Sequence, residues 1–332
     1  MKIACFSTKP YDEQFLSAAS EKFEHEFVFL EHRLDASTVV LAEGCDAVCA
    51  FVNDTLDASV LQRISEIGIG LLAMRCAGVN NVDLDAAAKF GVRVVRVPRY
   101  SPYAVAEHTI GLILTLNRKI HKAYNRVREN NFSIDGFLGF DLHGRTFGVI
   151  GTGAIGRTLA GIVGGFGCRV LMYDPYPNDE AKQLGEYVDL DRLLAESDLV
   201  SLQCPLTPDT YHLIDAERLS KMKRGAMLVN TSRGGLVDTS AAIEGLKSGQ
   251  LGGFALDVYE EESGVFFEDL SQQVMQDDVL SRLMTFPNVL ITSHQAFFTR
   301  EALETIADTT LQSIDAFSRD DELVNEVVAT PS

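Results

Sequence analysis

The sequence predicts an α/β protein of two domains, each a parallel sheet flanked by helices. Short β-rich runs alternate with stretches of helical periodicity in two separate series along the chain. The chain has 332 residues and a typical domain has about 150, so two domains are expected. Hydrophobic residues make up 46% of the chain, which is enough apolar material for two cores.

The first series occupies roughly the first hundred residues and predicts a small parallel sheet. Its runs are short and β-rich, and the stretches between them have apolar residues at helical spacing. Strands are expected at 3–6, 27–30, 47–52, 70–74 and 92–97, and helices at 11–23, 55–67 and 82–90.

A proline-bounded segment and a long helix are predicted next. Pro98 and Pro102 both disfavour helix in the residue before them, so 98–102 is interpreted as a linker. The stretch 103–130 has no proline, one glycine and apolar residues recurring at three and four, which predicts one long helix. We expect its apolar stripe to serve a subunit interface.

The second series predicts a doubly wound sheet. Six strands are expected at 146–150, 169–173, 199–204, 226–230, 253–258 and 289–292, with helices between most of them. The last helical stretch, 299–317, follows these strands and is expected to cross back over the first domain. The predicted domains are therefore 1–100 plus 299–332, and 101–298.

Charge and composition exclude several classes of function. The 29 Lys and Arg against 47 Asp and Glu give a net charge of −18, which repels nucleic acids and anionic membranes. No apolar run approaches a signal peptide or the roughly eighteen residues of a membrane span. The six cysteines are scattered without a CxxC pair, which favours reduced thiols, a cytoplasmic location and no metal site.

A glycine-rich motif predicts a dinucleotide site. The sequence GTGAIG places Gly151, Gly153 and Gly156 in GxGxxG spacing, with Ala154 and Ile155 between the last two. The motif directly follows a predicted strand and opens a predicted helix, which is the context that a dinucleotide-binding turn requires. Glycines let the backbone approach the pyrophosphate, and the helix N-terminus offers free amides to it.

The residue after the next strand predicts which dinucleotide binds. Asp174 follows the strand expected at 169–173, where a carboxylate accepts hydrogen bonds from the adenosine ribose. The same charge repels a 2′-phosphate, and residues 175–178 contain no arginine to receive one. NAD is therefore the expected cofactor, although Asp174 could also act only as a turn former before Pro175.

Three further glycines fall inside the helix that follows the motif. Gly161, Gly164 and Gly165 each cost about 1 kcal/mol relative to alanine in a helix interior. Either close packing on the sheet requires them, or the helix is less stable than its length allows. We favour the second interpretation.

Three polar residues lie at or beyond predicted strand ends, where open α/β sheets bind their ligands. Arg233 could pair with a carboxylate, and His294 could exchange a proton with a carbonyl oxygen near neutral pH. Glu262 ends an acidic run at 260–262 that composition alone describes as a solvated loop. The residue types alone do not select among the three glutamates or the seven histidines.

Taken together, these motifs resemble the D-isomer-specific 2-hydroxyacid dehydrogenases over essentially the whole chain. The resemblance lies in GTGAIG, PLTPDTYHLI at 205–214, VNTSRGGLVD at 229–238, ALDVYEEE at 255–262 and the late SHQAF. It implies two Rossmann-like or flavodoxin-like domains with the active site in the cleft between them. It also implies that His294 donates a proton as hydride arrives from NADH, that Glu262 stabilises the charged imidazole and that Arg233 binds the substrate carboxylate.

Further site residues are implied by the resemblance alone. The loop RCAGVNN at 75–81 is expected to bind the substrate carboxylate through backbone amides near Ala77 and Gly78, with Tyr100 closing the pocket and Phe297 forming an apolar wall together with Phe298. The positions expected to contact NAD, besides the glycine motif, are Cys204, Pro205, Thr210, Thr231 and Asp257.

The segment between Glu262 and His294 resembles the fermentative bacterial D-lactate enzymes of that family. This implies that pyruvate and D-lactate are the substrate pair, with phenylpyruvate, 2-ketobutyrate or hydroxypyruvate as alternatives. The D configuration rests wholly on the resemblance. A homo-oligomer, dimer or tetramer, is expected. A different class remains open, because NAD-sensing corepressors share this fold.

Overall fold

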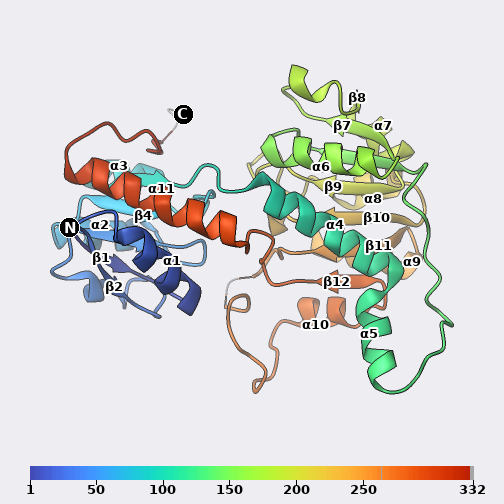
Figure 1. The fold of residues 1–332 in the computed structure, drawn as a ribbon, viewed down its shortest axis with the longest axis horizontal. Helices are drawn as coiled ribbons and strands as arrows, with labels where there is room; N and C mark the ends of the chain where they lie inside the picture. Colours follow the sequence, from blue (N-terminus) through green and yellow to red (C-terminus); the bar gives the residue numbers. More distant parts are fainter. Residues whose placement is uncertain (263, 330–332) are drawn as a thin grey trace. The chain divides into compact units, whose positions relative to one another are not determined.

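The protein, described here by a computed structural model covering residues 1–262 and 264–329, folds as two compact units (Figure 1). Unit 1 comprises Met1–Ser101 and Phe298–Ser332, and unit 2 comprises Pro102–Phe297. Each unit contains one parallel sheet with helices on both faces, so the predicted fold class is confirmed.

The sheet of unit 1 has five parallel strands in the order β2-β1-β3-β4-β5. This is the flavodoxin-like order, in which the chain reverses direction across the sheet at β1 and β3. The strands are β1 (Lys2–Cys5), β2 (Glu26–Phe29), β3 (Ala47–Ala50), β4 (Leu71–Met74) and β5 (Arg93–Arg96).

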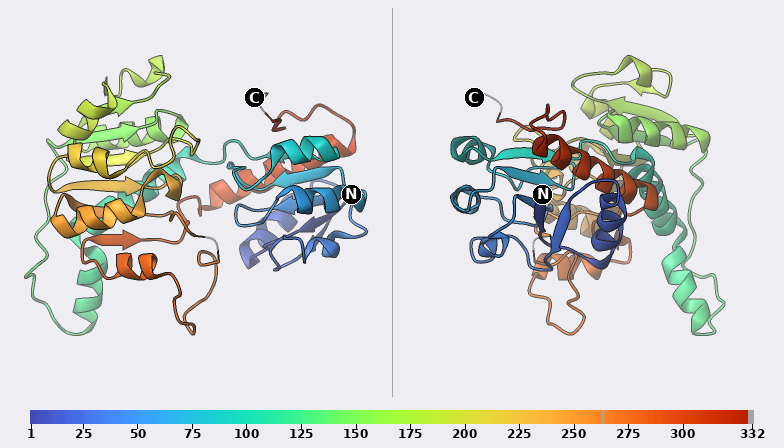
Figure 2. Two further views of the ribbon diagram at one scale, coloured as in Figure 1. Left: turned by 180° about the vertical axis from the view of Figure 1, so that it is seen from behind. Right: turned by 60° about the vertical axis from the view of Figure 1, so that its left-hand side comes forward.

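Helices cover both faces of this sheet (Figures 1 and 2). One face carries α1 (Pro10–Ser20) and α11 (Arg300–Ser318), and the other carries α2 (Ala58–Glu66) and α3 (Leu84–Phe90). A short 3₁₀ helix, η1 (Val39–Ala42), precedes β3. The core under α1 and α11 is apolar and draws on both ends of the chain: Ile3, Cys5, Leu16, Cys49, Leu71, Ala73, Ala307, Leu311 and Ile314.

The sheet of unit 2 has seven parallel strands in the order β12-β11-β10-β9-β6-β7-β8. The six predicted strands are present, and β8 is a two-residue edge strand that the sequence did not predict because it is too short to show alternation. The strands are β6 (Thr146–Ile150), β7 (Arg169–Tyr173), β8 (Glu186–Tyr187), β9 (Leu199–Leu202), β10 (Ala226–Asn230), β11 (Leu251–Leu256) and β12 (Val289–Ile291).

Helices cover both faces of this second sheet (Figures 1 and 2). One face carries α4 (Pro102–Arg118) and α6 (Ala154–Gly165). The other carries α7 (Leu190–Glu196), α8 (Ala216–Lys221), α9 (Thr239–Ser248) and α10 (Asp278–Met284). Two 3₁₀ helices, η2 (Asp179–Ala181) and η3 (Gly234–Leu236), lie in connecting loops.

The prediction of a single helix over 103–130 is wrong, because the helix is interrupted at Lys119. Lys119 has a left-handed backbone (φ 51°) and separates α4 from α5 (Ile120–Arg128). The side chain of Asn117 bonds both backbone groups of Phe140, at 2.9 Å and 2.7 Å, and so holds a distant loop against the end of α4. No residue of α5 is buried, and α5 extends away from the rest of unit 2 (Figure 1).

Aspartates begin many of the helices. In six helices an aspartate at the N-cap accepts a hydrogen bond from a backbone amide of the first turn, which stabilises the helix start: Asp57, Asp83, Asp189, Asp215, Asp238 and Asp277. Part of the acidic excess therefore has a structural role. None of the helices described, from α1 to α11, combines the length and the apolar composition that a bilayer span requires.

Candidate functional site

The glycine motif forms a tight turn between β6 and α6. Gly151 has a φ of +95°, and a Cβ on it would lie 2.6 Å from the carbonyl carbon and oxygen of Gln203. A Cβ on Gly156 would lie 1.9 Å from the carbonyl oxygen of Gly151. Gly153, the N-cap of α6, has open space where its Cβ would be. Gly151 and Gly156 therefore allow the close backbone contacts of the turn. Gly153 leaves the amides of Ala154 and Ile155 at an accessible helix N-terminus.

Asp174 follows β7 and belongs to a hydrogen-bonded group at the same edge of the sheet. Its Oδ2 accepts from the amide and hydroxyl of Thr152, at 2.7 Å and 3.0 Å, and its Oδ1 accepts from the Tyr176 amide at 2.9 Å. The Tyr187 hydroxyl donates to Thr152 Oγ1 at 2.7 Å. The carboxylate is thus fixed beside the glycine turn, and its Oδ1 keeps acceptor capacity for a further hydrogen bond. Thr152 and Tyr187 were not predicted as part of this group.

A second group of predicted residues lies at the carboxyl ends of β9 and β10. The backbone oxygen of Cys204 accepts from Ser232 Oγ at 2.6 Å, and Thr210 Oγ1 donates to the backbone oxygen of Pro205 at 2.7 Å. Thr231 lies 2.8 Å, oxygen to oxygen, from the hydroxyl of Thr109. Burial raises the pKa of Cys204 to about 11, so its thiol is neutral at physiological pH. Because β6 and β9 are neighbours, these residues and the glycine turn border the switch point of the sheet.

His294 and Glu262 form a pair within unit 2. The Nδ1 atom of His294 lies 3.0 Å from Glu262 Oε1, and their side chains are 14% and 27% exposed. Two aromatic rings border the imidazole: Phe267, with a centroid distance of 5.7 Å, and Phe297, at 6.5 Å and nearly perpendicular. Nδ1 faces the carboxylate, so Nε2 is the nitrogen left for a ligand.

A buried carboxylate holds the backbone that carries this histidine. Asp257, at the end of β11, accepts from the amides of Gln295 at 2.9 Å and Ala296 at 2.8 Å, and from the hydroxyl of Thr292. Burial alone would raise its pKa, but hydrogen bonds, first from His108 and then from these groups, bring the pKa below its ordinary value. Asp257 therefore stays charged and fixes the loop on which His294 adopts a left-handed conformation, with a φ of 49°.

The three glutamates of the acidic run have different partners. Glu260 Oε1 lies 2.5 Å from His212 Nε2, and its Oε2 accepts from the hydroxyl of Thr239 at 3.0 Å. Glu261 is exposed. Glu262 pairs with His294, as the resemblance implied and the composition of the run did not.

Arg233 lies at the carboxyl edge of the same sheet, just before η3. Its Nη1 donates to the backbone oxygen of the adjacent Ser232 at 2.7 Å, and no carboxylate pairs with it among residues 1–262 and 264–329. A Cβ on the next residue, Gly234, would lie 2.1 Å from the carbonyl of Tyr259. Gly234 thus lets the loop after β10 approach the loop after β11 closely. Arg233 is half-buried and its guanidinium can bind an anion.

The predicted substrate loop lies in unit 1, after β4. The amides of Ala77 and Gly78 donate to no acceptor among the residues that the structure describes, and Tyr100 is half-buried. Beneath the loop Arg75 is 1% exposed, and its Nε donates to Asp12 at 3.0 Å. The loop therefore offers two unpaired amides and lies next to a buried ion pair.

Phe298 is predicted to form an apolar wall together with Phe297. It belongs to unit 1, where its ring packs against Tyr11 with a centroid distance of 4.8 Å at 80°. That contact does not test the predicted apolar wall, so the role of Phe298 stays a prediction, and Phe267 is a further ring beside His294. Phe267 was not predicted because the segment around it has no helical or strand periodicity.

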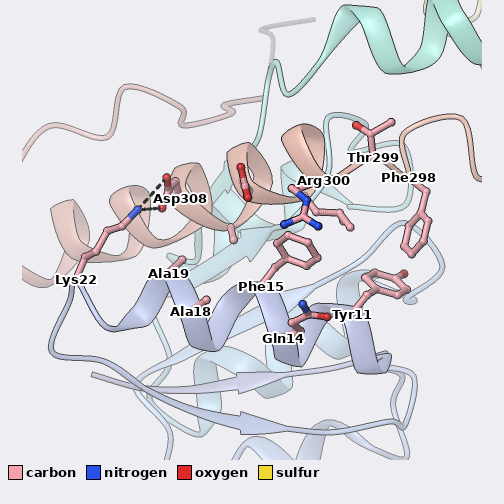
Figure 3. A pocket seen from close by; sticks show the side chains of 13 residues that line it. Tyr11, Gln14, Phe15, Ala18, Ala19, Lys22, Phe298, Thr299, Arg300 and Asp308 are labelled. Atoms are coloured by element: carbon pink, nitrogen blue, oxygen red, sulfur yellow. Dashed lines mark hydrogen bonds and ion pairs between the residues drawn. The ribbon is translucent and has the colours of Figure 1, made fainter.

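Unit 1 also has a hollow of about 680 Å³ between α1 and α11 (Figure 3). The contact between Tyr11 and Phe298 lies toward one end, and the ion pair of Lys22 with Asp308, at 2.9 Å, lies toward the other. Of the predicted site residues, Phe298 lines this hollow. No group of three or more potential metal ligands occurs within the described part of the chain.

Comparisons with known proteins agree with this geometry. Residues 110–296 match the NAD binding domain of the D-isomer specific 2-hydroxyacid dehydrogenases. D-lactate dehydrogenase of Escherichia coli K12 is 52% identical over 329 residues, which are 99% of this chain and 100% of that one. The chain belongs to the D-isomer specific 2-hydroxyacid dehydrogenase family.

Solved structures of this family have the same fold. The apo-structure of the E. coli D-lactate dehydrogenase has a TM-score of 0.90 at 49% identity and covers 99% of this chain and 100% of its own. The pyruvate reductase of Chlamydomonas reinhardtii has a TM-score of 0.92 at 46% identity, with 98% of each chain covered.

The cofactor of this dehydrogenase is NAD, because the matched domain binds it and the residues present fit it. The close approach of Gly151 and Gly156 to backbone atoms leaves no space for side chains in the turn. The carboxylate of Asp174 lies beside the glycine turn, and its negative charge would repel a 2′-phosphate, which favours NAD over NADP.

Proposed function

We propose that this protein is an NAD-dependent D-lactate dehydrogenase that reduces pyruvate to D-lactate. The observation that carries the proposal is the pair of His294 and Glu262, 3.0 Å apart between two phenylalanine rings. The E. coli D-lactate dehydrogenase and the C. reinhardtii pyruvate reductase, both about half identical to this chain, support the choice of substrate.

His294 acts as the proton donor in this reaction. Bound NADH supplies the hydride that attacks the keto carbon. Nδ1–H of the imidazolium donates to Glu262, so the proton that leaves is the one on Nε2, and it goes to the keto oxygen. The negative charge of Glu262 stabilises the imidazolium before the transfer. In the reverse direction the neutral imidazole accepts the proton of D-lactate.

One cation, Arg233, and two backbone amides bind the substrate carboxylate in this proposal. Arg233, which no carboxylate of the described chain neutralises, forms a charged hydrogen-bonded pair with it. The amides of Ala77 and Gly78 supply further donors, and Tyr100 closes over the substrate. Unit 1 is thus assigned as the substrate-binding domain and unit 2 as the NAD-binding domain.

The methyl group of pyruvate fits an apolar wall formed by Phe297 and, in addition, Phe267. Apolar walls discriminate weakly, since one methylene changes selectivity by about 1–3 kcal/mol. Turnover of 2-ketobutyrate and phenylpyruvate at lower kcat/KM is therefore expected.

We also assign the residues that contact NAD. They are the residues of the glycine turn, the ribose-binding carboxylate and the loops after β9, β10 and β11: Gly151, Gly153, Ala154, Ile155, Gly156, Asp174, Cys204, Pro205, Thr210, Thr231 and Asp257. The positions of these residues around the carboxyl edge of one sheet support this assignment.

A homo-oligomer that buries α5 and the loop after it is part of the proposal. Exposed apolar side chains gather there: Ile120, Tyr124, Val127, Phe132, Ile134 and Leu138, of which Leu138 is 90% exposed. Monomers seldom leave such a surface uncovered. We place the enzyme in the cytoplasm, where the six free cysteines remain reduced.

The test is a turnover assay with purified protein, pyruvate and NADH, repeated with NADPH and with His294→Ala. Oxidation of NADH that yields D-lactate, is weak with NADPH and falls at least about 100-fold in His294→Ala supports the proposal. His143→Ala, which alters an imidazole outside the proposed site, serves as the control. Equal activity of the two variants would refute the assignment of His294, and L-lactate as product would refute the stereochemistry.

A further inference from the structure

Arg96, at the carboxyl end of β5, holds one peptide of the substrate loop. Its Nη1 donates to the backbone oxygen of Ala77 at 3.0 Å. That oxygen belongs to the same peptide group as the amide of Gly78. A hydrogen bond from a charged donor to a peptide oxygen polarises the group and makes its N–H a stronger donor.

The preceding peptide is held from the same strand end. The amide of Val97 donates to the backbone oxygen of Cys76 at 3.0 Å, and this peptide carries the amide of Ala77. The oxygens of both peptides are therefore occupied, while both amides lack an acceptor in the described part of the protein. Fixed oxygens with free amides are the arrangement that preorganised anion sites use.

The charge of Arg96 is not neutralised locally. Within residues 1–262 and 264–329, its guanidinium has no carboxylate partner and only the one hydrogen bond to Ala77. Arg93 on the same strand differs, because both of its guanidinium bonds, at 2.8 Å and 2.6 Å, go to Glu326. In a chain with a net charge of −18, an unpaired cation behind two free amides favours an anion at that position.

Given the activity proposed above, we propose that Arg96 is a positioning residue for the substrate carboxylate. It acts through the peptide that joins Ala77 to Gly78 and does not touch the substrate. Its contribution lies in binding the carboxylate, which is equally charged in the ground state and the transition state. Loss of Arg96 therefore raises KM and changes kcat little.

The experiment compares Arg96→Met, Arg96→Lys and Arg93→Met in the full-length enzyme. The KM and kcat for pyruvate are measured at saturating NADH, together with the inhibition constant of oxamate, the Kd of NADH and the Tm. We expect Arg96→Met to raise KM and the oxamate constant together by about tenfold, with kcat within about threefold and NADH affinity unchanged. Arg96→Lys keeps a charge and a donor and should recover part of this loss.

Arg93→Met is the matched control, since it removes the same charge from the same strand without touching the loop. It should leave KM and the oxamate constant within about twofold of wild type. The inference is overturned if Arg96→Met leaves KM unchanged, if kcat and NADH affinity fall as much as pyruvate binding, or if Arg93→Met has the same effect. If wild type turns over pyruvate and Arg96→Met has the same KM, this inference alone is refuted. If wild type does not turn over pyruvate, the proposed function is refuted as well.

Discussion

Replacing Gly164 with alanine should stabilise unit 2. Gly164 lies in the last turn of α6 on its exposed side, and a Cβ there would have no heavy atom within 4 Å. Close packing on the sheet therefore does not require this glycine, nor Gly161, whose Cβ would lie 4.0 Å from Leu184. Glycine at an exposed helical position costs up to about 1 kcal/mol relative to alanine, because the unfolded chain has more freedom to lose. For a unit of this size, that gain raises the Tm by about 2–4 °C.

Gly156→Ala in the same helix is the matched control. The Cβ would lie 1.9 Å from a backbone oxygen, so the helix must move away from β6. Overpacking of this kind costs about 1–3 kcal/mol, and the movement also opens the glycine turn. We therefore expect a lower Tm and weaker binding of NADH in Gly156→Ala, opposite in sign to the effect of Gly164→Ala.

Scanning calorimetry measures both effects. The two units can unfold in separate transitions, and the transition of unit 2 is the one that rises on addition of NADH. Gly164→Ala should raise this transition with kcat and KM unchanged, since Gly164 lies at the opposite end of α6 from the glycine turn. A Tm at or below that of wild type would refute the reasoning.

Three further perturbations test the site and the cores. Glu262→Gln should lower kcat about 100-fold because a neutral amide does not stabilise an imidazolium, and activity equal to that of the exposed control Glu261→Gln would contradict the pairing. Arg75→Met should lower the free energy of unfolding by about 3–5 kcal/mol in a urea titration, because it leaves the buried Asp12 unpaired. The control Arg63→Met, at a half-exposed arginine, should change this free energy by less than about 1 kcal/mol. Equal urea midpoints for the two variants would disprove the role of the pair of Arg75 and Asp12. Because the pKa of Asp257 is lowered in the folded state, its ionised form stabilises the fold at pH values above the unfolded pKa of about 3.9. This stabilisation is lost as the pH falls below about 3.9 and through the folded pKa. Over that pH range the Tm of Asp257→Asn should therefore fall less than that of wild type.

The sequence predicted the regular elements well where the local signal is strong. The strands at Thr146–Ile150, Arg169–Tyr173 and Ala226–Asn230 have the predicted bounds, because each is a buried apolar run bordered by polar or glycine residues. The break at Lys119 has no glycine or proline to announce it. It depends on Asn117 and a loop 23 residues further along the chain, a tertiary contact that a local pattern does not contain.

The candidate site was predictable to different degrees. Gly151 and Gly156 could be assigned from spacing alone, because their roles follow from backbone geometry. Glu262 could not be assigned from spacing, because three consecutive glutamates differ only in which groups they contact in the fold. It was assigned from the resemblance to a family. Phe267 had no signal, because it approaches His294 from an irregular segment.

The division of unit 1 into two chain segments has a consequence for synthesis. The face of its sheet that α11 covers includes Leu71 and Ala73, and the residues that cover it, Leu311 and Ile314, are made only after all of unit 2. On the ribosome, unit 2 is therefore the first unit whose core can close, while the nascent amino-terminal sheet keeps an apolar face bare. This enzyme should therefore bind holdase chaperones during translation until α11 emerges, and a circular permutant that joins α11 directly to β1 should depend on them less.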